Sequence, residues 1–100
     1  MFVDITDDAE CDLEEIGDFI AREGSPNRAE TFVEELERAC VTLADGPLLF
    51  PLIQRYEEHG IRHRVHGNYQ IFYRVVEADD RIDVLRILNS RRDYHSILFP

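Results

Sequence analysis

Residues 69 to 88, YQIFYRVVEADDRIDVLRIL, have the pattern of a β-hairpin. On both sides of the acidic turn EADD, at 77–80, apolar and polar side chains alternate with the period of two that half-buried strands show. We therefore predict strands over residues 69–76 and 82–88. Because such strands bury one face, the hairpin also predicts a second layer that covers it.

The pairing of these two strands follows from the length of the turn. With Val76 opposite Arg81, Arg74 lies opposite Asp83, which brings opposite charges together across the strands. The same register predicts a buried face formed by Tyr69, Ile71, Tyr73, Val75, Ile82, Val84 and Leu88. Arg86 shares this face, so we expect it to reach the sheet edge or to find an acidic partner.

A third strand is predicted over residues 61–66, and the turn after it decides which of its side chains are buried. A two-residue Gly67-Asn68 turn would place Arg62 and Arg64 on the buried face. A three-residue turn that includes His66 would reverse the parity and bury Ile61, His63 and Val65. Because burying charge is costly, we expect the three-residue turn.

This register predicts an open sheet face of mixed character. Its side chains are those of Arg62, Arg64, Gln70, Phe72 and Arg74, with Asp83 and Leu85 beside them. A surface that is part basic and part apolar suits a polypeptide partner better than water.

The first half of the chain predicts a short strand and two helices. FVDI at 2–5 reads as the strand, followed by a helix that we expect to be capped by Asp7 and closed by Gly24 in a left-handed conformation. Ser25 and Pro26 suit the start of a second helix, which Gly46-Pro47 ends. The fold class is therefore α+β, in the order β-α-α-β-β-β, with the helical hairpin packed on one face of a small antiparallel sheet.

Charge is distributed unevenly along what we expect to be a single domain over residues 1–100. The net charge is −10, with 3 Arg against 14 Asp and Glu in residues 1–50 and 8 Arg against 7 acids in residues 51–100. The acidic total argues against direct nucleic-acid binding, which phosphate neutralisation drives. The absence of lysine favours bidentate pairing of arginine with carboxylate or phosphate.

Several other classes of protein are not expected. The chain has no apolar run long enough to span a membrane and no secretory leader pattern, which predicts a cytoplasmic protein. Two cysteines in helical patterns indicate thiols rather than a disulfide framework. His59, His63 and His66 do not converge on a strand, so no metal site and no cofactor are expected.

The ordered set of segments resembles the RelE/ParE superfamily of toxins from bacterial type II toxin–antitoxin systems. The resemblance lies in AECDLEEIGDFIA at 9–21, RAETFVEEL at 28–36, GIRHRVHGNYQIFYRV at 60–75 and VLRILNSRRD at 84–93. It implies a helical hairpin on an antiparallel sheet, with the first strand beside the last. It also implies a cognate antitoxin that wraps around the toxin in a hetero-oligomer. ParE members poison DNA gyrase, whereas RelE members cut messenger RNA on the ribosome.

Residue chemistry separates these two activities. RelE-like toxins resemble one another in lysines on the second strand, an arginine at the start of the third, an arginine after the last and a tyrosine near the C-terminus. Arg62 and Arg64 occupy the second-strand positions and Arg92 the one after the last strand, but Gln70 and Leu98 replace the third-strand arginine and the tyrosine. Arginine is a poor proton shuttle, so the resemblance favours a non-enzymatic, ParE-like toxin.

The expected binding sites follow from the open face and the C-terminal segment. We expect an antitoxin to contact Arg62, Arg64, Phe72, Arg74 and Leu85. We expect the cellular target, DNA gyrase by resemblance alone, to contact Arg91, Arg92 and Tyr94. A ribosome-dependent ribonuclease and a non-toxic antitoxin-binding module remain as alternatives.

Overall fold

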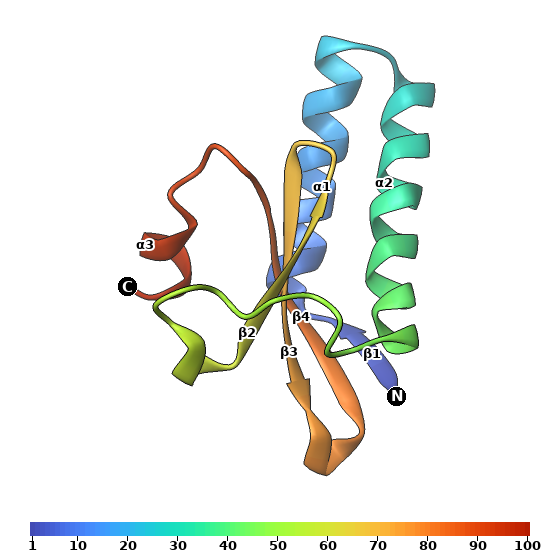
Figure 1. Ribbon diagram of the computed structural model, residues 1–100. Helices are drawn as coiled ribbons and strands as arrows, with labels where there is room; N and C mark the ends of the chain where they lie inside the picture. The colour runs from blue at the N-terminus through green and yellow to red at the C-terminus, as the bar shows by residue number, and fades with distance from the viewer.

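The computed structural model describes residues 1–100 and places a four-stranded sheet between two unequal layers. Two long helices cover one face of the sheet, while the C-terminal segment and a loop cover the other (Figure 1). The elements are β1 (Phe2–Ile5), α1 (Asp7–Glu23), α2 (Pro26–Val41), η1 (Thr42–Asp45), η2 (Glu57–His59), β2 (Ile61–His66), β3 (Tyr69–Val76), η3 (Glu77–Asp79), β4 (Arg81–Asn89) and α3 (Tyr94–Leu98).

The two long helices begin at side-chain caps. Thr6, rather than the expected Asp7, caps α1, because its Oγ1 accepts the backbone N–H of Ala9 at 3.4 Å. Ser25 caps α2 as predicted, with Pro26 directly after it. Gly24 ends α1 by donating its N–H to the carbonyl of Ile20, but its φ of −132° is not left-handed, so that expectation was wrong.

The strand order is β1-β4-β3-β2, which confirms the predicted α+β fold and places the first strand beside the last. β3 and β4 pair in the predicted register, with Val76 opposite Arg81 and Arg74 opposite Asp83. β1 runs parallel to β4, which makes the sheet mixed rather than wholly antiparallel.

The expected register of β2 was wrong. The turn is the two-residue Gly67-Asn68, with His66 opposite Tyr69 and Arg62 opposite Tyr73. Gly67 adopts a φ of +59°, which a two-residue hairpin favours and which glycine adopts without strain. Arg62 and Arg64 therefore share the helix side of the sheet with their cross-strand partners Tyr73 and Ile71.

A bulge in β4 changes which side chains its second half presents. Tyr73 lies opposite Val84 while Phe72 lies opposite Arg86, which leaves Leu85 as an extra residue. As a result Ile87 packs on the helix side and Leu88 on the other, although Leu88 was expected with the helices.

The two faces of the sheet hold separate apolar clusters. The helix-side cluster contains 12 buried residues, among them Leu36, Ile71 and Val84. The tail-side cluster contains four, Ile53, Ile61, Phe72 and Leu88, with aromatic and aliphatic side chains of the C-terminal segment packed on them. No helix has the length and apolar character needed to cross a bilayer.

Candidate functional site

Arg62 and Arg64 bind backbone carbonyls at the C-terminal end of α2 and in the loop after it. Arg64 Nη1 donates to the carbonyl of Ala39 at 2.7 Å and to Thr42 Oγ1 at 2.9 Å. Arg62 Nη1 donates to the carbonyl of Phe50 at 2.8 Å. The last carbonyls of a helix lack partners within it and carry partial negative charge, so a guanidinium stabilises them. These contacts explain how two arginines can occupy the helix side of a sheet.

Tyr73 extends this anchor into the core. Its hydroxyl donates to the carbonyl of Pro47 at 2.8 Å, and its side chain is fully buried. Burial raises the pKa of Tyr73, while the positive charge of Arg62 opposes the rise. The loop after α2 is thus fixed to the sheet by hydrogen bonds from Tyr73 and Arg62.

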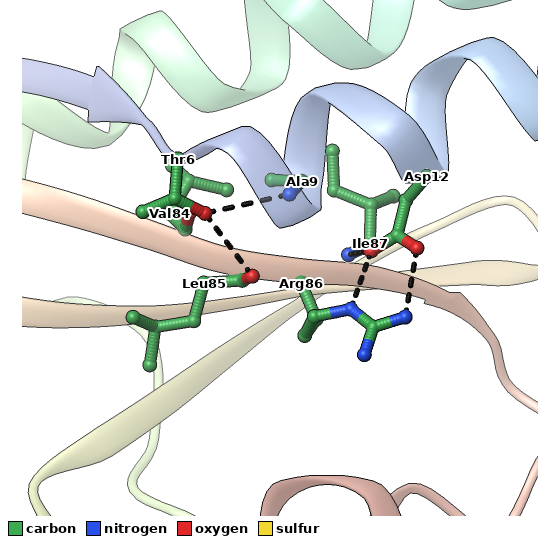
Figure 2. A network of polar contacts seen from close by, with 7 residues as sticks. All are labelled: Thr6, Ala9, Asp12, Val84, Leu85, Arg86 and Ile87. Atoms are coloured by element: carbon green, nitrogen blue, oxygen red, sulfur yellow. Dashed lines mark hydrogen bonds and ion pairs between the residues drawn. The ribbon is translucent and has the colours of Figure 1, made fainter.

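The buried carboxylate of Asp12 holds Arg86, which the bulge places opposite Phe72 rather than on the helix side where it was expected. Arg86 donates through Nε and Nη2 to the two carboxylate oxygens at 2.8 and 2.9 Å, and the Ile87 N–H donates at 2.9 Å (Figure 2). The hydrogen bond to Asp12 raises the pKa of Arg86, so the guanidinium stays charged. The expected acidic partner exists, although the sequence did not identify Asp12.

The expected open face of the sheet is covered. Phe72 has no exposed surface, because Tyr94 packs on it with ring centres 5.0 Å apart. Leu85 is half-buried against the same cluster. Arg62 and Arg64 lie on the opposite side, and only Arg74 is exposed, with Nε donating to the carbonyl of His59. The five residues expected to bind an antitoxin therefore do not form one surface.

The residues expected to contact the target lie around the last turn before α3. Arg91 and Arg92 are exposed, and neither guanidinium has a hydrogen-bond or ion-pair partner. Tyr94, by contrast, is half-buried against Phe72 and His95.

The second half of the chain thus has two groups of arginines. One group bonds within the chain, namely Arg62, Arg64, Arg74, Arg81 and Arg86, and the other does not, namely Arg55, Arg91 and Arg92.

The two positions that depart from the ribonuclease pattern hold side chains engaged inside the protein. Gln70 is buried, and its Oε1 accepts a hydrogen bond from His63 Nδ1 at 2.8 Å. Leu98 packs against the tail-side cluster. Neither side chain can donate or accept a proton during RNA cleavage.

A groove opens where the helical hairpin extends past the end of the sheet. It encloses about 750 Å³ between α1, α2 and the turn that joins β2 to β3. Its apolar lining comes from Phe19, Ile20, Phe32 and Tyr69, and Phe19 is 49% exposed. Glu23 and Glu35 lie among its polar lining residues. This groove was not predicted from the sequence, because the helical spacing of Phe19 and Phe32 does not distinguish a core side chain from one that lines an open groove.

Comparisons with known proteins agree with this architecture. A family model described as the ParE toxin of the type II toxin–antitoxin system parDE matches residues 3–94. Toxin ParE1 of Mycobacterium tuberculosis, found in two strains, is 32% identical over 85 residues, which are 85% of this chain and 85% of the relative.

Solved structures show the same fold at lower identity. A chain of the chromosomal ParDE system from P. aeruginosa superposes with a TM-score of 0.72 at 22% identity, covering 89% of this chain and 95% of that one. A chain of the RelBE2 complex from Mycobacterium tuberculosis gives 0.66 at 21%, covering 88% and 95%. A chain of the E. coli RelBE complex gives 0.63 at 17%, covering 91% and 98%.

A strand, a helical hairpin and a three-stranded meander closed by a short C-terminal helix define the α+β fold of these toxins. The family model and the ParE1 relative then assign the family. The chain belongs to the ParE toxin family of type II toxin–antitoxin systems.

Proposed function

We propose that this protein is the toxin of a toxin–antitoxin pair and that it acts on DNA gyrase rather than on messenger RNA. The main support for this choice comes from Gln70 and Leu98, which stand at the two positions where the chain differs from the ribonuclease pattern. Both side chains are engaged in contacts within the protein. RNA cleavage needs a group that removes the 2′-OH proton and one that protonates the leaving oxygen. The match to ParE over most of the chain supports the same choice.

The exposed arginines after β4 are the proposed contacts with the target. Arg91 and Arg92 are the adjacent pair whose guanidinium groups are free of internal partners, and a planar guanidinium recognises carboxylates bidentately. Tyr94, which packs under this turn, positions the segment rather than contacting the target.

The antitoxin is proposed to bind the groove at the end of the helical hairpin. Half-exposed Phe19 and the neighbouring rings of Phe32 and Tyr69 offer an apolar anchor site. This site replaces the open sheet face expected from the sequence, because the C-terminal segment already covers Phe72 and Leu85. Arg74 remains available at the sheet surface as a rim contact.

Expression in a bacterium tests the activity. We expect filamentation with an induced DNA-damage response, and we expect the purified chain to block DNA supercoiling by gyrase in vitro. Messenger RNA mapped from the same cells should show no new cleavage within translated codons. Cleavage at codons without an effect on gyrase would establish the ribonuclease alternative, and normal growth would establish the non-toxic module.

Paired substitutions test the two contact sites. The double variant Arg91→Ala/Arg92→Ala should lose toxicity while it retains the fold, measured by circular dichroism. The matched control is Arg22→Ala/Arg38→Ala, which removes the same charge from exposed positions on the helices. Phe19→Asp should instead remain toxic and lose neutralisation by the antitoxin. Unchanged toxicity of the Arg91/Arg92 variant would remove these residues from the site.

A further inference from the structure

The segment between β4 and α3 presents the two proposed target contacts on a turn whose backbone is fixed. It leaves the sheet at the end where β2 and β3 join (Figure 1). Ser90 donates its N–H to the carbonyl of Asn68, in the β2–β3 turn, at 2.8 Å. The next two N–H groups, of Arg91 and Arg92, both donate to Asn89, at 2.9 Å to its side-chain Oδ1 and at 3.0 Å to its carbonyl. Asn89 therefore fixes the backbone of both arginines.

The side chain of Asn89 makes one hydrogen bond within the chain, and that bond is to this turn. Because a backbone N–H can only donate, the atom that accepts the N–H of Arg91 is the amide oxygen and not Nδ2. An asparagine that bonds the N–H two residues further on forms an Asx turn, which mimics a backbone turn. On the far side of the pair, the N–H of Tyr94 donates to the carbonyl of Arg92 at 2.9 Å. The arginines are thus held from both sides.

An acidic side chain of α1 lies next to this turn. Arg92 and Glu15 line the same cavity of about 290 Å³, which lies between α1 and the end of β4. The other carboxylate of the cavity, that of Asp12, is already bound to Arg86. Glu15 makes no ion pair, although an arginine borders the same space. A pair between Glu15 and Arg92 would withdraw the guanidinium from any partner outside the chain.

We propose that Asn89 is a positioning residue for the target contact. Its side chain holds the turn so that Arg91 and Arg92 stay exposed and Arg92 stays apart from Glu15. A turn that is fixed before binding also avoids the loss of backbone freedom that a flexible segment suffers when a partner orders it. Asn89 acts through the arginines and need not touch the target. The inference rests on the proposed role of Arg91 and Arg92 and names the residue on which that role depends.

Toxicity of three variants in a bacterium tests the positioning role. Asn89→Ala removes the acceptor and should raise the amount of toxin needed to stop growth by about tenfold or more, the effect of losing a charge-assisted contact. Asn89→Ser should recover part of this loss, because a hydroxyl forms the same turn more weakly. The control Asn68→Ala removes an exposed amide beside the turn but keeps the carbonyl that binds Ser90, so it should match the parent. Parent-like toxicity of Asn89→Ala, or equal losses in the Ala and Ser variants, would overturn the proposal.

A second substitution separates positioning from a loss of stability. Glu15→Gln in the Asn89→Ala background removes the carboxylate that captures Arg92, so it should restore toxicity. A chain that Asn89→Ala had merely destabilised would gain nothing from this change. In the parent, where the turn already keeps the two charges apart, Glu15→Gln should leave toxicity unchanged. A double variant as weak as Asn89→Ala alone would overturn the proposal.

Nuclear magnetic resonance of the isolated chain distinguishes a failure of this proposal from a failure of the proposed function. In Asn89→Ala, exchange of the Arg91 amide proton should be faster by about tenfold or more. The Nε signal of Arg92 should shift, and Glu15→Gln should reverse that shift. Unchanged exchange with an unchanged Arg92 signal would overturn the positioning role. If these changes occur while Arg91→Ala/Arg92→Ala remains toxic, the failure lies with the proposed target contact and not with Asn89.

Discussion

The two faces of the sheet are covered in different ways. On the helix side, the helical layer and the sheet form a cluster of 12 buried residues, and the Asp12–Arg86 pair ties α1 to β4. On the tail side, a loop and the five-residue α3 bury four residues without any ion pair between the covering segment and the strands. The helix side therefore defines the fold. The tail side carries the arginines that have no partner within the chain, Arg55, Arg91 and Arg92.

The largest difference between the faces should appear when the buried charge pair is broken. Asp12→Ala leaves Arg86 and the Ile87 N–H without their acceptor, and we expect a loss of about 3–5 kcal/mol in the free energy of unfolding. Urea titration measures this loss. The control Glu15→Ala, at an exposed position of the same helix, should stay within about 0.5 kcal/mol. A similar loss for both variants would show that Asp12 is not a specific anchor.

Adjacent residues of β4 offer a matched test of the two clusters. Ile87 is 1% exposed on the helix side, and Leu88 is 2% exposed on the tail side. We expect Ile87→Ala to lower the free energy of unfolding by about 3–4 kcal/mol and Leu88→Ala by about 2, because the thin tail layer can collapse into the space left. Equal losses would mean that the tail layer is packed as rigidly as the helices.

The same contrast explains how much the sequence could predict. The N-terminal cap of α2 and the register of the β3–β4 hairpin depend on local residues, so Ser25, Val76 and Arg81 could be placed from the sequence. The β2 register failed because it depended on the cost of burying Arg62 and Arg64. The cost is offset by distant carbonyls, that of Ala39 near the end of α2 for Arg64 and that of Phe50 in the following loop for Arg62, which no local pattern reveals.

The candidate sites were harder to predict for a related reason. A short amphipathic tail and an apolar loop give no signal of which sheet face they cover, so Phe72 and Leu85 were expected to be open. The bulge at Leu85 also reversed the parity of β4 and sent Leu88 to the tail side. By contrast, Arg91 and Arg92 lie close after the last strand, and both side chains are exposed.

The arginine contacts with α2 allow a smaller test on the helix side. Arg64→Ala removes the hydrogen bonds to Ala39 and Thr42 at a partly exposed position, so we expect a loss of about 1–2 kcal/mol. Arg64→Lys should recover part of it through its charge. Thermal unfolding at low and high salt measures both variants, with the exposed Arg38→Ala as control. A loss no larger than that of Arg38→Ala would contradict the role of Arg64 as an anchor.

The smallest effect should come from one thiol in the helix-side cluster. Burial raises the pKa of Cys40 from 9.0 to about 12, so above pH 9 the unfolded chain loses this proton while the folded chain keeps it. Stability should therefore fall as pH rises from 9 toward 12, with a contribution of about 1 kcal/mol by pH 10. Urea titrations at pH 8 and 10 measure it. Cys40→Ala should remove this component of the pH dependence, whereas Cys11→Ala, at an exposed site, should preserve it. An equal pH dependence in the Cys40→Ala variant would mean that the helix-side layer admits water to the thiol.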